Sequence, residues 1–166
     1  MAKEHSMDIV SKINTQTLRD IIQITKKTVV NRFDLKDKAN QIDFNEKDEK
    51  LELTGVSNIS INSIVEIFKA TCIKQNLSVK AFDFGDILPA AGATVKMTAK
   101  IKQGIDQENI RKINELIKES DIKVKTTNQK DQIRVVSKSI DDLQSTIRLI
   151  QSSEKIDIAI QYDNLK

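Results

Sequence analysis

Hydrophobic residues recur along this chain with two periods that alternate in a regular order. Every second residue is apolar in segments such as 41–45 (QIDFN) and 50–54 (KLELT), which is typical of β-strands that bury one face. Between such segments the apolar residues recur every three or four positions, as on one face of an amphipathic α-helix. In segment 15–30 this stripe consists of Leu18, Ile21, Ile22, Thr25 and Val29.

The two periods predict the element order β-α-β-β-α-β, and they predict it twice. In the first half the elements span residues 7–13, 15–30, 41–45, 50–54, 61–76 and 79–84. In the second half they span 93–102, 106–120, the two strands of the hairpin 123–138, 139–153 and 156–162, with Asp106 and Ser139 as N-caps of the two helices. This order is that of the split-βαβ, ferredoxin-like motif in tandem. We therefore expect an α+β protein in which two helices cover one face of each four-stranded antiparallel sheet.

The best linker signal is the segment 85–93 (GDILPAAGA). It contains the only proline of the chain and two of its four glycines. The simplest division into domains is therefore 1–88 and 93–166.

The predicted hairpin 123–138 (KVKTTNQKDQIRVVSK) gathers cations on one face. If Val124, Ile133 and Val135 point toward the helices, the opposite face carries Lys123, Lys125, Arg134 and Lys138. The strand 93–102 likewise places Lys100 and Lys102, with Lys96, opposite its apolar row. Phosphate groups would neutralise such a surface, so these residues are the candidate nucleotide-binding residues. The alternative is a solvated strand face whose lysines prevent edge-to-edge aggregation.

Charge is distributed unevenly between the two halves. The net charge is +3; residues 1–92 hold 13 basic and 13 acidic residues, and residues 93–166 hold 14 and 11. This excess points weakly to an anionic partner, although simple solubility explains it equally well. Aromatic residues make up only 4% of the chain and are absent from the basic hairpin, so contact with phosphates is favoured over base stacking. The equivalent face of the first half, around Asp43 and Glu52, is mixed and slightly acidic.

Catalytic and metal sites are not predicted, and we expect neither enzymatic activity nor a cofactor. The single histidine, His5, falls in an expected flexible tail, and the glycines form neither a Walker loop nor a dinucleotide fingerprint. Gly104 precedes a helix, where free amides can hold a phosphate, but a simple turn is the favoured interpretation. Cys72 lies on an apolar helix stripe and is expected in the core.

Two further features bear on location and contacts. The apolar stretches are far shorter than the roughly 20 residues of a membrane helix, and no signal peptide is recognisable, so we expect a cytoplasmic protein without membrane contact. After the first predicted helix, Arg32, Phe33 and Asp34 stand together. They form either a helix-end contact with an Arg–Asp pair or part of a groove between domains.

Several segments resemble the YajQ family of bacterial nucleotide-binding proteins. They are MDIVSKI, NRFDLK, CIK, KIKQGI, SDIKVK and, most specifically, QIRVVSKSIDDLQSTI. The family's opening motif usually begins with phenylalanine and ends with glutamate, where this chain has Met7 and Lys12, and its DFR- or DFK-like element is Asp34-Leu35-Lys36.

The resemblance implies that the two ferredoxin-like domains exchange their first strands. Strand 7–13 would join the C-terminal sheet and strand 94–102 the N-terminal sheet, giving domains 14–102 and 1–13 plus 103–166. It also implies a groove between the two halves. Lys100 and Lys102 would then leave the basic hairpin.

The resemblance also implies non-enzymatic binding of nucleotides or nucleic acid, with RNA and cyclic dinucleotides as ligands. We therefore expect a regulatory protein that contacts phosphates through a basic sheet face. The alternative is a protein-interaction adaptor in which the open sheet face binds a regulatory partner, and apolar Val136 on that face favours it.

Overall fold

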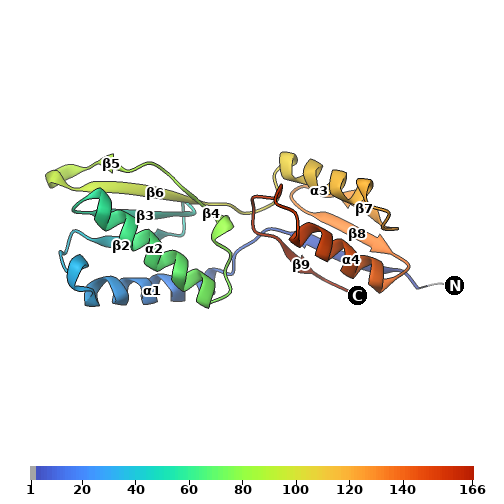
Figure 1. Ribbon diagram of the computed structural model, residues 1–166, viewed down its shortest axis with the longest axis horizontal. Helices are drawn as coiled ribbons and strands as arrows, with labels where there is room; N and C mark the ends of the chain where they lie inside the picture. Colours follow the sequence, from blue (N-terminus) through green and yellow to red (C-terminus); the bar gives the residue numbers. More distant parts are fainter. Residues whose placement is uncertain (1–2) are drawn as a thin grey trace. The chain divides into compact units, whose positions relative to one another are not determined.

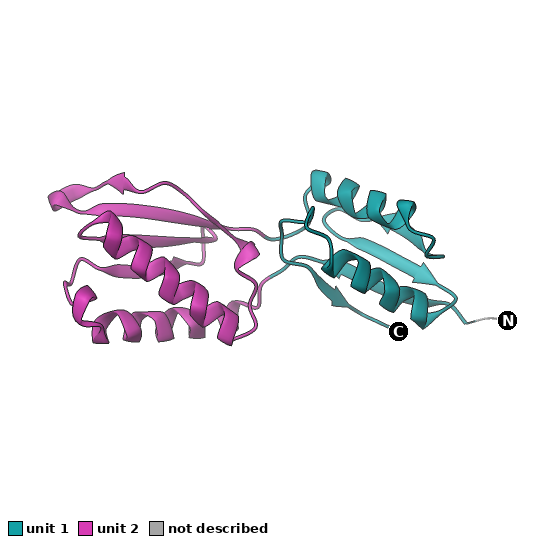
Figure 2. Ribbon diagram, in the orientation of Figure 1, with its two compact units in different colours: residues 1–12, 103–166 teal, residues 13–102 magenta. Residues whose placement is uncertain are grey.

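The computed structural model describes residues 3–166, which form four α-helices and two antiparallel sheets. The chain divides into two compact units (Figure 2): unit 1 comprises residues 1–12 and 103–166, and unit 2 comprises residues 13–102. Each unit contains one sheet and two helices, which is consistent with duplicated ferredoxin-like units.

Unit 2 contains a sheet with the strand order β2-β3-β6-β4. These strands are β2 (Gln41–Asn45), β3 (Lys50–Gly55), β6 (Val95–Ile101) and β4 (Phe82–Phe84), and the short β5 (Leu88–Pro89) also pairs with β6. Helices α1 (Thr15–Asn31) and α2 (Asn58–Lys74) cover one face of the sheet (Figure 1). Asn14 and Ser57 begin these helices by accepting hydrogen bonds from the backbone amides of Thr17 and Ser60.

Unit 1 repeats this arrangement with the strand order β7-β8-β1-β9. The strands are β7 (Lys125–Asn128), β8 (Ile133–Ser137), β1 (His5–Val10) and β9 (Gln161–Asp163). Helices α3 (Gln107–Glu119) and α4 (Ile140–Gln151) complete the unit (Figure 1). Asp106 caps α3 as expected, because its carboxylate accepts from the Asn109 amide at 3.2 Å.

The strand pairing crosses between the two halves of the sequence. β1 lies between β8 and β9, with Met7 opposite Val135 and Asp8 opposite Arg134. β6 lies between β3 and β4, with Leu53 opposite Met97. The chain therefore passes from one unit to the other at 12/13 and at 102/103.

The glycine-rich segment 85–93 does not separate the two units, contrary to the linker prediction. It lies inside unit 2, where Leu88 and Pro89 pair with Lys96 and Val95 of β6. A proline is tolerated here because β5 is a short strand at the edge of the sheet, paired with β6.

Strand phase follows the hydrophobic pattern. Ile133 and Val135 of β8 are fully buried with Met7 and Ile9 of β1, and Val124 packs partly buried against the same core. In unit 2, alternate residues of β3 and β6 are buried in the same way: Leu51, Leu53, Met97, Ala99 and Ile101. The remaining residues of each strand face away from the helices.

Three elements differ from the sequence-based prediction. β9 covers only Gln161–Asp163, and the preceding Ile156 and Ile158 are buried without forming a strand. Helix α2 begins at Asn58 because Ser57 caps it. His5, expected in a flexible tail, belongs to β1, and its Nδ1 lies 2.9 Å from the backbone oxygen of Lys166.

Among residues 3–166, every helix is too short or too polar to span a membrane.

Candidate functional site

The candidate site is a hollow of about 370 Å³ at one end of the β7–β8 hairpin. Its lining consists of Glu4, Lys123, Val124, Lys125, Val136, Ser137, Lys138 and Asp142. We call it the lysine hollow because three of its eight lining residues are lysines. Its volume falls within the range of small-molecule sites, roughly 300–1,000 Å³.

The three lysines are brought together by local backbone structure. Lys125 is the first residue of β7 and pairs with Val136 of β8, so its side chain leaves the sheet on the face away from the helices. Lys123 precedes β7 and Lys138 follows β8, and both are exposed. In the described part of the chain, the ammonium groups of these three lysines make no ion pair or hydrogen bond.

Ser137 fixes the end of the hollow. Its hydroxyl donates to the backbone oxygen of Lys123 at 3.0 Å and accepts from the backbone amide of Ser139 at 3.2 Å. Ser139 occupies the N-cap position of α4, as expected, but its side chain makes no capping hydrogen bond. One buried serine thereby connects the segment before β7, the end of β8 and the first turn of α4.

Arg134, the fourth predicted cation, forms an ion pair with Asp8 on β1. Its guanidinium donates two hydrogen bonds to the carboxylate of Asp8, at 2.9 and 3.2 Å. The side chain of Asp8 is only 4% exposed, although it lies on the sheet face that no helix covers. The hydrogen bonds from Arg134 hold the pKa of Asp8 below its usual value, and the same contact raises the pKa of Arg134.

The chain segment after β9 completes this polar cluster. The side-chain amide of Asn164 donates to Asp8 at 2.8 Å, and the backbone amide of Lys166 donates to the oxygen of Ser6 at 3.0 Å. Lys12 forms an ion pair with Asp163 at 2.7 Å. The cluster therefore ties β1 to both β8 and the C-terminal segment.

Lys100 and Lys102 lie in unit 2, because β6 belongs to that sheet. Lys100 stands directly opposite Lys50 of β3 and Asp83 of β4. The ammonium group of Lys50 is also 3.4 Å from the carboxylate of Glu52. These two predicted residues thus belong to a mixed surface rather than to the basic hairpin.

Strand exchange also redistributes the net charge. Unit 2 contains 14 basic and 11 acidic residues, whereas unit 1 contains 13 of each. The excess attributed to the C-terminal half therefore belongs to the other unit, because β6 carries its lysines there. The case for an anion site in unit 1 depends on the local arrangement of lysines and not on total charge.

The remaining candidates have structural roles. Gly104 has a φ of 81°, and its backbone amide donates to the backbone oxygen of Ser11. Asp131 also lies against Gly104, so this glycine forms a turn and does not leave a free amide for a phosphate. Cys72 is buried, which raises the pKa of its thiol to about 12. Arg32 and Asp34 form a two-bond ion pair at the end of α1, at 3.0 and 2.8 Å. Among residues 3–166, no group of histidine, cysteine or acidic residues is arranged to hold a metal ion.

Sequence reasoning missed the acidic members of this surface. Asp8 stands between the apolar residues Met7 and Ile9 in β1, and a carboxylate at that position is a signal for a partner on a neighbouring strand. Glu4 and Asp142 also lie in the lysine hollow. Identifying the partner of Asp8 required the register of β1 against β8, which hydrophobic periodicity does not specify.

Comparison with known proteins gives one consistent result. The family described as nucleotide-binding protein YajQ-like matches residues 5–166. Proteins from Desulfitobacterium hafniense, Bacillus cereus and Bacillus mycoides are 36%, 37% and 38% identical to this chain, each over 166 residues and the full length of both proteins. All three are named nucleotide-binding proteins. The chain therefore belongs to the family of YajQ-like nucleotide-binding proteins.

Proposed function

We propose that this protein is a non-enzymatic regulatory protein that binds a nucleotide or RNA through the lysine hollow. Lys123, Lys125 and Lys138 contact phosphate groups, and Val124 and Val136 provide an apolar floor for the remainder of the ligand. The observation that carries the proposal is the position of three lysines, without ion-pair partners in the described chain, around one hollow of suitable size. The names of the relatives supply the ligand class.

The proposal assigns different roles to the other predicted cations. Arg134 already satisfies the buried Asp8 carboxylate, so it supports the sheet and does not contact phosphate. Lys100 and Lys102 lie in unit 2 and are not part of the lysine hollow. Glu4 and Asp142 reduce the positive potential of the hollow, and they would favour a ligand that presents N–H donors beside its phosphates.

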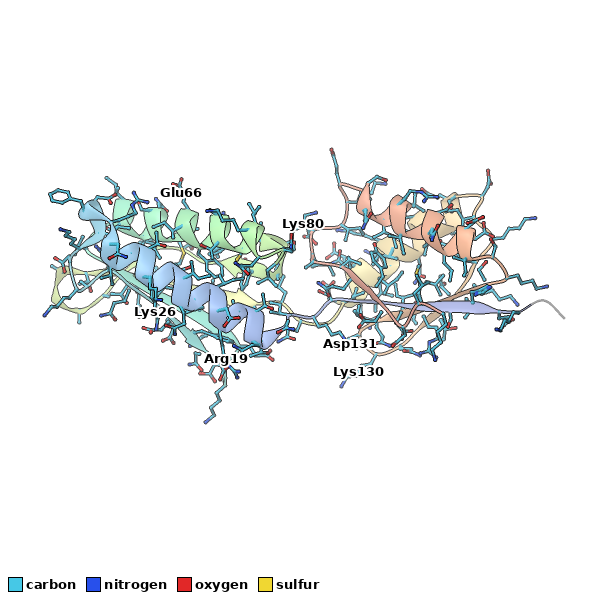
Figure 3. All side chains as sticks on the ribbon, turned by 90° about the horizontal axis from the view of Figure 1, so that it is seen from below. Arg19, Lys26, Glu66, Lys80, Lys130 and Asp131 are labelled. Atoms are coloured by element: carbon cyan, nitrogen blue, oxygen red, sulfur yellow. The ribbon has the colours of Figure 1, made fainter. Side chains whose placement is uncertain are left out.

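The experiment is a titration of the full chain with a short single-stranded RNA and with a cyclic dinucleotide, each at two ionic strengths. Lys125→Glu should weaken binding by about tenfold or more, because it replaces a charge-assisted contact with repulsion. The matched control is Lys130→Glu, which reverses an exposed lysine in the turn of the same hairpin but outside the hollow (Figure 3). Lys130→Glu should leave the affinity within about twofold.

The outcomes separate the alternatives. For a single-stranded ligand, log K falls with log salt by about 0.7 per phosphate neutralised, so a steep dependence indicates RNA and a shallow one a small nucleotide. Equal affinities for Lys125→Glu and Lys130→Glu would overturn the proposed site. Loss of binding on Lys100→Glu alone would move the site to unit 2.

The second candidate function is a protein-interaction adaptor that uses the open sheet face. Val136 supports it, because this apolar side chain faces away from the helices and is only half-buried. A partner retained by the full chain after nuclease treatment at high salt, and lost on Val136→Asp, would favour this function over nucleotide binding.

A further inference from the structure

The loop that follows helix α1 in unit 2 displays an aromatic ring to solvent. It begins with Arg32 and the 3-10 turn η1 (Phe33–Leu35) and continues to Lys38. We call residues 32–38 the Phe33 loop. Phe33 is 87% exposed, although phenylalanine is usually among the most buried residues of a folded protein. A ring exposed to this degree is a candidate contact for a ligand.

The backbone of the loop keeps Phe33 outside the core. Leu35, two residues further on, is only 2% exposed, and its amide donates to the backbone oxygen of Arg32 at 3.1 Å. The Arg32 guanidinium donates two hydrogen bonds to the Asp34 carboxylate, which lowers the pKa of Asp34. Leu35 therefore takes the core position of this turn, and Phe33 cannot enter the core without displacing it.

Positive charge is concentrated in the same part of unit 2. Residues 26–38 contain five basic and two acidic residues, a net charge of +3, which equals the whole excess of unit 2 with its 14 basic and 11 acidic residues. Lys26 and Arg32 have carboxylate partners. Three exposed lysines of this segment form no ion pair in the described chain: Lys27, Lys36 and Lys38.

Lys36 brings charge and ring together. Its Nζ lies 5.2 Å from the centroid of the Phe33 ring. Such a cation–π contact is weak at an exposed site, and one ammonium group covers only one face of the ring. A protein surface that covered Phe33 by apolar contact alone would also bury nearby lysines without counter-ions, which is costly. A partner with flat rings and phosphates fits both the ring and the lysines.

We propose that the Phe33 loop is a contact for single-stranded RNA. One base stacks on the Phe33 ring, and the neighbouring phosphates meet Lys36 and Lys27. Stacking on an exposed ring accepts any base, because every base has a π-face. The inference takes its ligand class from the proposed function and adds a separate site in unit 2, outside the lysine hollow. It also supplies the aromatic contact that the basic hairpin lacks.

The first test places a fluorescent reporter at the ring. The chain has no tryptophan, so Phe33→Trp in the full chain gives a single emitter that can still stack. An eight-nucleotide oligoadenylate should quench its fluorescence to saturation. An abasic oligomer of the same length keeps the phosphates but offers no base, and it should need at least about a fivefold higher concentration.

Charge reversal in the same reporter tests the phosphate contacts. Lys36→Glu should raise the half-saturating RNA concentration by about fivefold. The matched control, Lys47→Glu, reverses an exposed lysine in the β2–β3 turn and should change it by less than about twofold. Lys125→Glu in the lysine hollow should also leave this quenching curve within about twofold, because the reporter senses only the Phe33 loop.

The native ring is tested by fluorescence anisotropy of labelled oligoadenylate, in the Lys125→Glu background so that the lysine hollow contributes little. Phe33→Ala should weaken the remaining binding by about fivefold or more, and Phe33→Leu, which stays apolar but cannot stack, should not restore it. The control Ile73→Ala removes another exposed apolar side chain of unit 2, 67% exposed, and should change binding by less than about twofold.

Four results would each overturn the inference. They are no saturable quenching, equal quenching by the abasic oligomer, equal effects of Lys36→Glu and Lys47→Glu, and a dimer in sedimentation without RNA that Phe33→Ala abolishes, because a second copy would then cover the ring. The proposed function fails on a different result, namely unchanged ligand affinity of Lys125→Glu in the otherwise native chain.

Discussion

Replacing Arg134 with alanine should destabilise unit 1, because the replacement leaves the Asp8 carboxylate buried with a single partner. Asp8 is 4% exposed and accepts three hydrogen bonds, two from Arg134 and one from Asn164. Breaking a fully buried ion pair costs about 3–5 kcal/mol. Since the Arg134 side chain is 47% exposed, water reaches part of the pair, and we expect a loss of about 2–3 kcal/mol for the stranded carboxylate.

Replacing Asp8, the partner of Arg134, should lower the stability of unit 1 by less than replacing Arg134 does. In Asp8→Asn the buried group is neutral, and Arg134 can turn its guanidinium toward water, so we expect a loss of about 1–2 kcal/mol. The double variant should then be less destabilised than the sum of the two single variants, since removing one partner already loses most of the interaction.

Acid should remove the same contribution. The folded-state pKa of Asp8 is lowered, chiefly by Arg134, relative to an unfolded value of about 3.9. The stabilisation is therefore complete above about pH 5 and is lost as the pH falls through 4 toward the folded-state pKa. The difference between the native sequence and Asp8→Asn should shrink over that range.

The measurement is urea unfolding followed by tyrosine fluorescence at pH 7, 5, 4 and 3. Tyr162 is the only tyrosine, the chain has no tryptophan, and Tyr162 packs against the core of unit 1, so the signal reports that unit. The control is Lys26→Ala in unit 2, which removes an exposed ion pair and should change the free energy of unfolding by at most about 0.5 kcal/mol. Its unfolding is followed by circular dichroism. An additive double variant, or an Arg134→Ala cost no larger than that of Lys26→Ala, would refute the assigned role of Asp8.

Four further predictions concern three buried or strained residues. Gly104→Ala should destabilise unit 1 by about 1–2 kcal/mol in urea, because φ is 81° and a Cβ would approach Asp131 to 2.9 Å. Burial raises the pKa of Tyr162 to about 12, so absorbance should show no phenolate near pH 10.5 in the folded protein, and stability should fall as the pH rises from 10 toward 12. Tyr162→Phe should not destabilise unit 1 by circular dichroism, since the buried hydroxyl has no partner in the described chain. Cys72, whose thiol pKa is about 12, should react with a disulfide reagent at pH 8 only as unit 2 unfolds.

The hydrophobic periodicity predicted which face of each strand and helix is buried, because that depends on local sequence alone. The alternation of Ile133 and Val135 with Arg134 determined which side chains of β8 face the helices, and the structure agrees. The helix stripe of α1 is buried at the predicted positions. These features follow from the shape of the backbone, and they need no knowledge of the neighbouring strands.

The identity of neighbouring strands could not be obtained in this way. An alternating strand buries one face equally well in either of two similar sheets, so the apolar pattern of β1 is compatible with both halves. The family resemblance implied the exchange, and the pairing of Met7 with Val135 shows β1 in the C-terminal sheet. Ile156 and Ile158 were wrongly assigned to a strand for a related reason, because alternating burial also occurs in segments that do not form a strand.

Strand exchange changes how the candidate site must be interpreted. It places Lys100 and Lys102 in unit 2, and it brings Asp8 beside Arg134, which then forms an ion pair. Of the six predicted cations, three remain together around one hollow: Lys123, Lys125 and Lys138. The same exchange makes unit 1 electrically neutral overall. In the proposed function, an anion is attracted to unit 1 by the short-range arrangement of Lys123, Lys125 and Lys138 rather than by total charge, since exposed charges more than about 10 Å apart are screened at 0.1 M salt. Substitutions of distant lysines should consequently have little effect on affinity, whereas substitutions inside the hollow should have large ones.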